Sequence, residues 1–326
     1  MTSAQGSDAR FKMLDWSDLP GWDADDHAAA LTAFRDSCDK LKDDTWSAIC
    51  GVAGEQKNAR SFFELFFRPV EITGENPTLF TAYYEPELQA SRVRTEIYRY
   101  ALYARPPDMP TGQAWYTRQQ LEDGGILQGR GLELAWLSDP VDRFFLHVQG
   151  SGRLRLTDGT SMRLGFAAKN GHQYRSVGQE MARRGVLPPN KLSAGSIKAW
   201  VRRNPEAGRR FLQHNPSYIF FRELNLPPEK GPVGAMGVSI TTMRTVAVDP
   251  DFVPLGAPVW IEKLGVEPMT RLMVAQDTGS AIKGAGRADI FYGSGKDAGD
   301  RAGIVRDSGR MVVLFPIETA LALADG

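Results

Sequence analysis

The sequence predicts a mainly β protein with peripheral helices, in which one barrel is interrupted by an inserted domain. Glycine (33 residues) and proline (20 residues) are frequent enough to favour many tight turns between short strands over a helical bundle. Short apolar runs separated by Gly, Pro and Asp fill roughly the last hundred residues, a spacing typical of a small closed barrel. Strand-like runs also precede a central block of helical segments, so strands lie on both sides of that block.

The first part of the chain reads as a helical preface, over residues ~23–68. The stretch "DDHAAALTAFRDSCDKL" has apolar residues at helical spacing, and either Asp25 or Asp26 can cap the helix. Two further helices are predicted from "TWSAICGVAG" and "NARSFFELFF", with Gly51 and Gly54 marking the break between them. The apolar faces of these helices require something to pack against.

The middle of the chain is predicted to begin with strands and to end with helices. "TLFTAYYEPELQAS" favours a strand that Pro86 limits, and "EIYRYALYARP" favours another. "RFFLHVQGSGRLRLTDGTSMRLGFAAKNGH" reads as a set of strands, and the Asp-Gly within residues 157–160 predicts a two-residue hairpin turn. Three short helices follow, and Asn204 with Pro205 marks the start of the last one. These helices are predicted from "QYRSVGQEMARRG", "SAGSIKAWVRRN" and "NPEAGRRFLQHNP".

Composition excludes several classes of protein. Lys+Arg and Asp+Glu balance at 39 each, so the chain lacks the electrostatic footprint of a general nucleic-acid binder. The sequence contains no run of ~18 apolar residues, so no membrane-spanning helix is predicted. The start, "MTSAQGSDARF", lacks the basic and apolar regions of a signal peptide, which fits either a cytosolic protein or a mature form. Cys38 and Cys50 fit two buried thiols or, in an oxidising compartment, a disulfide.

Three aspartates are the candidate chemical groups. Asp289 opens the apolar run "DIFY", where burial would raise the carboxyl pKa and suit it to donate a proton to a glycosidic oxygen. The alternative is an Asp that pairs with Arg287 or caps a turn. Asp277 follows the predicted strand "RLMVAQ" and could orient a sugar hydroxyl or act as a turn residue. Asp249, in "VDPDFVPLG", is most simply a turn residue.

Other chemistry is poorly supported. The four histidines are scattered without metal-ligand spacing, and no second pair of soft ligands accompanies the cysteines, so no metal site is expected. "QGSGRL" lacks the spacing of a nucleophile elbow around Ser151, and no phosphate-binding or dinucleotide fingerprint is present. Phe80, Tyr83 and Tyr84 fit either a strand core or the lining of a groove for sugar rings.

Six motifs in order resemble the membrane-bound lytic transglycosylase A family, with its C-terminal three-aspartate domain, over residues ~78–316. They are "FTAYYEPELQAS", "HVQGSGRLRLTDG", "AAKNGHQYRSVGQEM", "NPSYIFF", "VAVDPDFVPLG" and "AQDTGSAIKGAGRADIFYGSG". The resemblance implies a double-psi β-barrel interrupted by a second, smaller β-rich domain, with a glycan groove between them. The implied division is a preface at 1–69, a barrel at 70–87 plus 219–326, and an insert with short helices at 88–218.

The resemblance also implies the reaction. Family members cleave the β-1,4 bond between N-acetylmuramic acid and N-acetylglucosamine in peptidoglycan without water, leaving a 1,6-anhydro end. The family's catalytic Asp falls on Asp289, its supporting barrel Asp on Asp277, and its third Asp on Asp249. An ordinary glycosidase needs two carboxyl groups, whereas attack by the sugar's own C6 hydroxyl lets one carboxyl serve first as acid and then as base. The implied substrate-binding residues are Thr81, Tyr83, Tyr84, Ser151, Lys283 and Tyr292, and no metal or cofactor is required.

The implied location is the bacterial cell envelope, in the periplasm and with the outer membrane as one option, although the chain shows no lipid-attachment cysteine. The implied partners are peptidoglycan glycan strands, and no residue identifies a partner in a wall-synthesis complex. Two alternatives stay open: a hydrolase that uses Asp277 and Asp289 as a pair, and a non-catalytic wall-binding module. Glycan length preference, exo or endo cleavage, the role of peptide stems and oligomeric state are not encoded in any recognisable motif.

Overall fold

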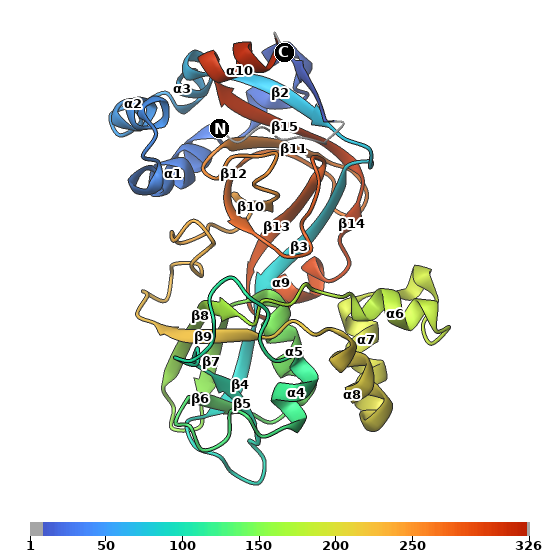
Figure 1. Ribbon diagram of the computed structural model, residues 1–326. Helices are drawn as coiled ribbons and strands as arrows, with labels where there is room; N and C mark the ends of the chain where they lie inside the picture. The colour runs from blue at the N-terminus through green and yellow to red at the C-terminus, as the bar shows by residue number, and fades with distance from the viewer. Residues whose placement is uncertain (1–8, 325–326) are drawn as a thin grey trace. The chain divides into compact units, whose positions relative to one another are not determined.

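The computed structural model describes residues 9–324, so the signal-peptide expectation for the first residues lies largely outside the described part of the chain. These residues form two compact units (Figure 1). Of the described residues, unit 1 comprises 9–83, 233–293 and 305–324, and unit 2 comprises 84–232 and 294–304. The predicted class, mainly β with peripheral helices and one barrel interrupted by a second sheet domain, is confirmed.

Unit 1 is built on a nine-stranded sheet with the strand order β1-β2-β15-β11-β12-β10-β13-β3-β14. Its strands curl into a nearly closed six-stranded barrel (Figure 1). The short strands predicted for roughly the last hundred residues are present. The strands are β1 (Arg10–Met13), β2 (Phe67–Thr73), β3 (Leu79–Glu85), β10 (Thr245–Val248), β11 (Pro258–Lys263), β12 (Met269–Thr278), β13 (Arg287–Ser294), β14 (Arg306–Asp307) and β15 (Gly309–Pro316).

The helical preface packs its apolar faces onto this sheet. Its helices are α1 (His27–Ser37), α2 (Asp44–Ala53) and α3 (Ala59–Phe66), and the terminal helix α10 (Ile317–Ala324) contacts β2. Phe34 and Phe62 are fully buried in one core cluster with Trp260 of β11. Burial of this aromatic surface stabilises the packing of the helices on the sheet.

Capping explains where these helices begin and end. Asp26 caps α1 by accepting from the Ala29 N–H at 3.0 Å, while Asp25 instead forms a buried ion pair with Arg244. The expectation that Gly51 marks a break is wrong, since it lies inside α2 and only Gly54 ends that helix. Packing of the neighbouring turns outweighs the modest helix penalty of one glycine.

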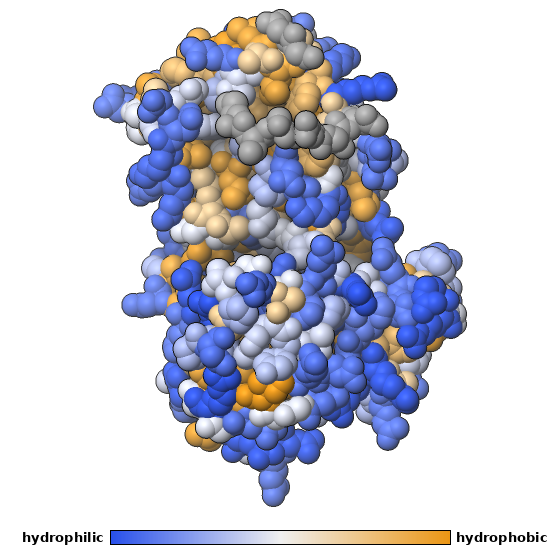
Figure 2. All heavy atoms as spheres, in the orientation of Figure 1, coloured by the Kyte–Doolittle hydropathy of each residue, from blue (hydrophilic) through white to orange (hydrophobic). Residues whose placement is uncertain are grey.

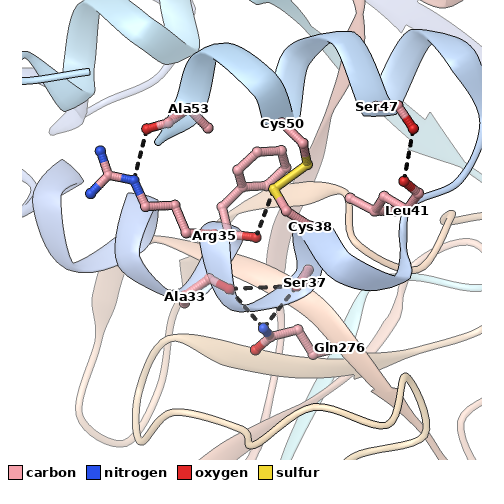
Figure 3. The surroundings of a disulfide bond; sticks show 10 residues. Ala33, Arg35, Ser37, Cys38, Leu41, Ser47, Cys50, Ala53 and Gln276 are labelled. Atoms are coloured by element: carbon pink, nitrogen blue, oxygen red, sulfur yellow. Dashed lines mark hydrogen bonds between the residues drawn. A yellow bond between two sulfur atoms is a disulfide. The ribbon is translucent and has the colours of Figure 1, made fainter. Parts of the chain in front are cut away.

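The two cysteines are joined. Cys38, just after α1, and Cys50 of α2 form a disulfide with 5.5 Å between their Cα atoms (Figure 3). Of the two readings that the sequence left open, the disulfide is the one that the structure contains. Closing a loop of this size restricts the unfolded chain and typically stabilises by about 3 kcal/mol.

Unit 2 is a six-stranded sheet with the order β5-β6-β4-β7-β8-β9 and flanking helices. Pro86 separates β3 from β4, as expected. Its strands are β4 (Glu87–Ser91), β5 (Tyr100–Tyr103), β6 (Glu133–Leu137), β7 (Gly152–Leu156), β8 (Ser161–Lys169) and β9 (Ile219–Leu224). Its helices are α4 (Arg118–Asp123), α5 (Pro140–Gln149), α6 (Val177–Arg183), α7 (Ala194–Arg203), α8 (Pro205–His214) and α9 (Gly295–Ala302).

Two local predictions in unit 2 need correction. The run "RFFLHVQ" is helical, not a strand, because Asp139 caps α5 and Pro140 occupies its first turn. The β7–β8 hairpin is present, but its loop has three residues, since Leu156 and Thr160 still pair by a backbone hydrogen bond of 2.8 Å. Gly159 takes the left-handed conformation (φ 84°) that such a loop requires.

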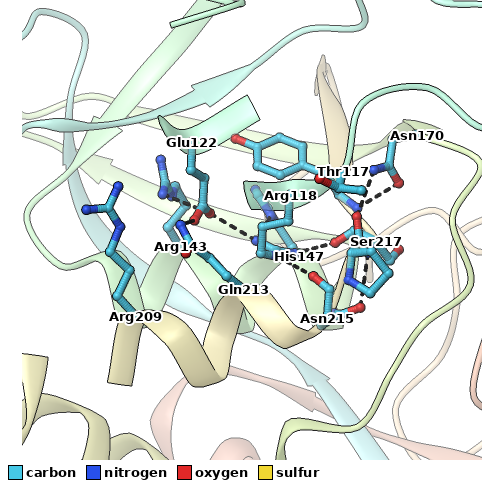
Figure 4. Close-up of polar contacts among 12 residues, drawn as sticks. Thr117, Arg118, Glu122, Arg143, His147, Asn170, Arg209, Gln213, Asn215 and Ser217 are labelled. Carbon is cyan, nitrogen blue, oxygen red and sulfur yellow. Dashed lines mark hydrogen bonds and ion pairs between the residues drawn. The ribbon is translucent and has the colours of Figure 1, made fainter. Parts of the chain in front are cut away.

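A buried polar network holds α4 and α5 against the sheet of unit 2 (Figure 4). Glu122 lies 3.3 Å from Arg118 Nη1 and 3.0 Å from Arg143 Nη2. Arg118, only 1% exposed, also donates to the backbone oxygens of Asn215 and Ser217. Buried charges are tolerated only with this degree of pairing.

His147 in the same network should make the stability of unit 2 fall in acid. Arg118 can only donate, so the Nδ1 atom of His147, 3.0 Å away, accepts and the ring is neutral. Burial, together with the charges of Arg118 and Arg143, lowers the His147 pKa well below its ordinary value of 6.5. Below about pH 6.5, His147 therefore binds a proton in the unfolded chain but stays neutral in the folded unit. The stability of unit 2 drops as pH falls through that range.

Hydrogen exchange in residues 84–232, measured at pH 7.5 and pH 5 and corrected for intrinsic rates, checks this expectation. His147→Gln removes the titrating ring and should reduce the acid-dependent loss of protection. His214→Gln leaves His147 intact and should keep the wild-type dependence. An undiminished acid effect in the His147 variant would contradict the assignment.

The visible surface is mostly hydrophilic (Figure 2), with apolar residues gathered near α10 and β2, where Leu321 is 48% exposed. Within residues 9–324, the helices are all too short or too polar to cross a membrane.

Candidate active site

The centre of the barrel sheet aligns two of the predicted aspartates in one row. Ala247 of β10 lies opposite Asp277 of β12 on one side and opposite Asp289 of β13 on the other. Directly opposed residues project to the same face of a sheet, and their Cα atoms here are about two strand spacings, or about 9–10 Å, apart. Both aspartate residues are half-buried.

Asp289 is held from one side by a fixed chain of hydrogen bonds. Arg287 Nη2 donates to Thr81 Oγ1 at 2.7 Å, and Thr81 Oγ1 donates in a short bond to Asp289 Oδ1. Because a guanidinium can only donate, the bond from Arg287 leaves the Thr81 hydroxyl proton available for the carboxyl group, the direction assigned to this hydrogen bond. Arg287 therefore acts on Asp289 through Thr81, rather than in the direct pair that the sequence also allowed.

The surroundings of Asp289 favour its protonated form. Burial raises the Asp289 pKa above its ordinary value, and the negative charge of Asp277 adds to this effect. The hydrogen bond from Thr81 and the charge of Arg287 oppose it without reversing it. A carboxyl group with a raised pKa and a locked orientation is suited to general acid chemistry.

Asp277 accepts hydrogen bonds at both of its carboxylate oxygens. Its Oδ1 accepts from the backbone N–H groups of Ala235 (2.8 Å) and Thr278 (2.9 Å), and its Oδ2 accepts from the Tyr83 hydroxyl at 2.8 Å. Burial raises the Asp277 pKa, although these three bonds oppose the shift. Burial and the nearby Asp277 charge raise the Tyr83 pKa well above its ordinary value, so Tyr83 stays a hydrogen-bond donor.

Asp249 follows β10 and fastens the loop that precedes β13. It is 3% exposed, and its two oxygens accept from Lys283 Nζ at 2.9 Å and from the Gly284 N–H at 2.8 Å. Burial alone would raise the Asp249 pKa, but these bonds outweigh it and hold the pKa below its ordinary value. Asp249 is therefore a charged anchor of the loop, and Lys283, predicted to bind substrate, is engaged with it.

The remaining predicted site residues are distributed unevenly. The Tyr292 ring of β13 is in the interior, at 2% exposure. Tyr84 and Ser151 belong to unit 2, where Ser151 is buried between α5 and β7 and Tyr84 is half-buried. The structure thus brings together Thr81, Tyr83, Asp277 and Asp289 within unit 1. Sequence reasoning missed that Arg287 acts through Thr81, since 206 positions separate the two residues.

Unit 2 contains a cavity of about 900 Å³ of its own. Two of its guanidinium groups are already paired, Arg143 with Glu122 and Arg202 with Asp139. Its lining offers no carboxyl group held in the way Asp289 is held. The aspartate row of the barrel is therefore the candidate active site.

A barrel interrupted by a second sheet domain here carries one oriented carboxyl group of raised pKa, an arrangement suited to an enzyme that works by general acid catalysis. Two family descriptions match the chain: "MltA specific insert domain" over residues 79–222 and "3D domain" over residues 244–315. The chain is 31% identical over 325 residues to membrane-bound lytic murein transglycosylase A of Escherichia coli K12, covering 93% of this chain and 86% of that protein. The chain belongs to the membrane-bound lytic murein transglycosylase A family, and the resemblance seen in its motifs is confirmed.

Solved structures agree with this assignment. The membrane-bound lytic murein transglycosylase of Agrobacterium tumefaciens matches with a TM-score of 0.88 and 34% identity, covering 96% of this chain and 99% of that one. The Neisseria gonorrhoeae protein (monoclinic form) matches with a TM-score of 0.81 and 35% identity over 97% and 94% of the two chains. A third match is the E. coli protein with bound chitohexaose, with a TM-score of 0.75, 29% identity and 94% of each chain covered.

Proposed function

We propose that this chain is a peptidoglycan lytic transglycosylase in which Asp289 acts first as acid and then as base. Asp289 gives its proton to the oxygen of the MurNAc-β-1,4-GlcNAc bond, and the bond between that oxygen and the MurNAc C1 breaks. The resulting carboxylate takes the proton of the MurNAc C6 hydroxyl while the C6 oxygen bonds to C1. The product is a 1,6-anhydro end, the proton is back on Asp289, and no water is consumed.

The observation that carries this proposal is the way Asp289 is held. Thr81 occupies Oδ1 as a hydrogen-bond donor, so we assign both proton transfers to Oδ2. The raised pKa favours the protonated form that a general acid requires. Attack by a hydroxyl of the same sugar is intramolecular, and such proximity can supply on the order of 7–11 kcal/mol at best.

Asp277 would support the site rather than activate water. Three hydrogen bonds already engage its two oxygens, so it is poorly placed to serve as the second carboxylate of a hydrolase. Its charge and its bond to Tyr83 would instead tune Asp289 and shape the surface beside it. We also propose that Thr81, Tyr83, Tyr84, Ser151, Lys283 and Tyr292 contribute to glycan binding, directly or by shaping the surface.

We propose that the chain associates with the bacterial cell envelope, which the names of its membrane-bound relatives support. The finer location in the periplasm, with the outer membrane as one option, is a proposal. Peptidoglycan glycan strands are the proposed partner, and binding of a glycan by the E. coli relative supports that class of ligand. We further propose a division into a helical preface, a barrel and an insert, for which the sequence indicated 1–69, 70–87 plus 219–326, and 88–218; in the structure residues 84–87, 219–232 and 294–304 belong to the compact unit of the insert.

Mass analysis of muropeptides released from purified peptidoglycan tests the reaction. The expected products carry anhydro ends. A hydrolase would give products heavier by one water, and a non-catalytic binding module would bind peptidoglycan without releasing products. Either of the last two results would overturn the proposal.

Thr81→Val should slow cleavage by roughly ten- to a hundredfold, because it removes the hydroxyl that orients Asp289 while keeping the shape of the side chain. It should also move the alkaline limb of the pH profile of kcat/KM to higher pH, since a bond that favours the Asp289 carboxylate is lost. Thr81→Ser keeps the hydroxyl and is the matched control. Wild-type rate and pH profile in Thr81→Val would show that this bond plays no part.

A further inference from the structure

A β-bulge lies beside the aspartate row. Along β10 and β12, Thr245 lies opposite Val274 and Val246 opposite Ala275, but Ala247 lies opposite Asp277. Gln276 is therefore an extra residue on β12 with no opposite on β10. Bulges are rare between parallel strands and are over-represented next to active sites, where they redirect a side chain.

The bulge decides which β12 residue joins the row. In a regular ladder, Gln276 would lie opposite Ala247, and Asp277 would lie opposite Val248 with its side chain on the other face. With the extra residue, Asp277 instead shares the row and the face of Ala247 and Asp289. The arrangement of the two aspartates thus depends on the bulge staying in place.

The Gln276 side chain holds the bulge against α1. It is fully buried, and its Nε2 donates to the Ala33 carbonyl at 2.8 Å and to Ser37 Oγ at 2.9 Å (Figure 3). Its Oε1 accepts a short hydrogen bond from Thr245 Oγ1. Both N–H groups and the oxygen of the amide are therefore hydrogen-bonded, and residues of α1 and β10 hold the extra residue in place.

The backbone of Gln276 leads to the partners of Asp277. Its carbonyl oxygen accepts from the Met236 N–H at 3.1 Å, in the segment whose Ala235 N–H donates to Asp277 Oδ1. At Gly234 an added Cβ would lie 2.6 Å from the same carbonyl oxygen, so this segment fits closely against the bulge. Ser37, in turn, immediately precedes Cys38, which the disulfide ties to α2.

We propose that Gln276 is a positioning residue, which pins the β12 bulge to α1 and so keeps Asp277 on the same face as Asp289. This inference rests on the proposed function, because it gives the aspartate row a role in the cleavage. Gln276 touches no substrate in this account. It acts only through the placement of Asp277.

Gln276→Met tests the proposal, since methionine fills the space without making the three hydrogen bonds. With solubilised peptidoglycan strands as the probe, kcat should fall about ten- to a hundredfold while KM changes by no more than about twofold. The alkaline limb of the pH profile should move to lower pH, because Asp277 no longer raises the Asp289 pKa fully. That shift is opposite to the one expected for Thr81→Val.

Val274→Ala is the matched control, because Val274 is buried in the core that α1 covers but lies outside the bulge. It should lower Tm while keeping kcat and the pH profile. Ser37→Ala removes one of the Gln276 bonds and should shift kcat and the pH profile in the same direction as Gln276→Met by a smaller amount. This variant decides the matter if Gln276→Met does not fold.

The outcomes separate the two proposals. If wild type and Val274→Ala release anhydro products but Gln276→Met, or failing that Ser37→Ala, matches Val274→Ala in kcat and pH profile, Gln276 is only structural and this inference falls alone. If wild type itself releases no anhydro products, the proposed function falls and the inference falls with it.

Discussion

Asp289→Asn should reduce the release of anhydro products by at least about a thousandfold, because both proton transfers are lost with one carboxyl group. The amide oxygen can still accept the Thr81 hydrogen bond, so glycan binding should survive. Turnover is measured as muropeptide release, and binding as cosedimentation with sacculi. Asp251→Asn, at an exposed aspartate 3.8 Å from Lys283, is the control and should keep wild-type turnover within about twofold.

Asp289→Asn should be at least as stable as wild type at neutral pH. The pKa of Asp289 is raised in the folded state above its value in the unfolded chain, so the folded state binds the proton more tightly. The wild-type protein therefore loses stability as pH rises from the unfolded-state pKa through the folded-state pKa. An amide at this position avoids the buried charge. A variant that is inactive but strongly destabilised would point to a structural role instead.

Glu122→Gln should destabilise unit 2 by about 3–5 kcal/mol, because it leaves the buried guanidinium groups of Arg118 and Arg143 without their counter-charge. The loss is measured by urea unfolding, with hydrogen exchange over residues 84–232 to assign it to this unit. Adding Arg143→Met to the variant should recover part of the loss, since one of the uncompensated charges is then removed.

Glu87→Gln is the matched control for that experiment. Glu87 pairs with Arg155, whose side chain is 64% exposed, so its loss should cost no more than about 1 kcal/mol. Equal costs for the two variants would contradict the view that the Glu122 network supports the unit from within.

Local signals in the sequence were sufficient for many elements. Asp26 caps α1, and Pro205 begins α8, because these residue types satisfy or avoid unpaired backbone groups at a helix start. The sequence of α5 reads as a strand because its Phe- and Val-containing run fits both periodicities. The deciding signal, Asp139 followed by Pro140, lies just before that run.

The candidate site shows where sequence reasoning stops. The residue types and motifs named Asp289, Asp277 and Thr81, but the hydrogen bond from Thr81 to Asp289 joins positions 208 apart in the chain. The bulge at Gln276 has no local signature, since it exists only through pairing with β10 and the grip of α1. Contacts of this kind arise from tertiary packing, and no periodicity records them.

In the proposed reaction, one carboxyl group cleaves the glycan while the sugar, and not water, supplies the attacking oxygen. Digestion of peptidoglycan in oxygen-18 water tests it directly. We predict anhydro-ended products that contain no oxygen-18 at the muramic acid C1. Products with a reducing end that carries the label from the first turnover would contradict the account.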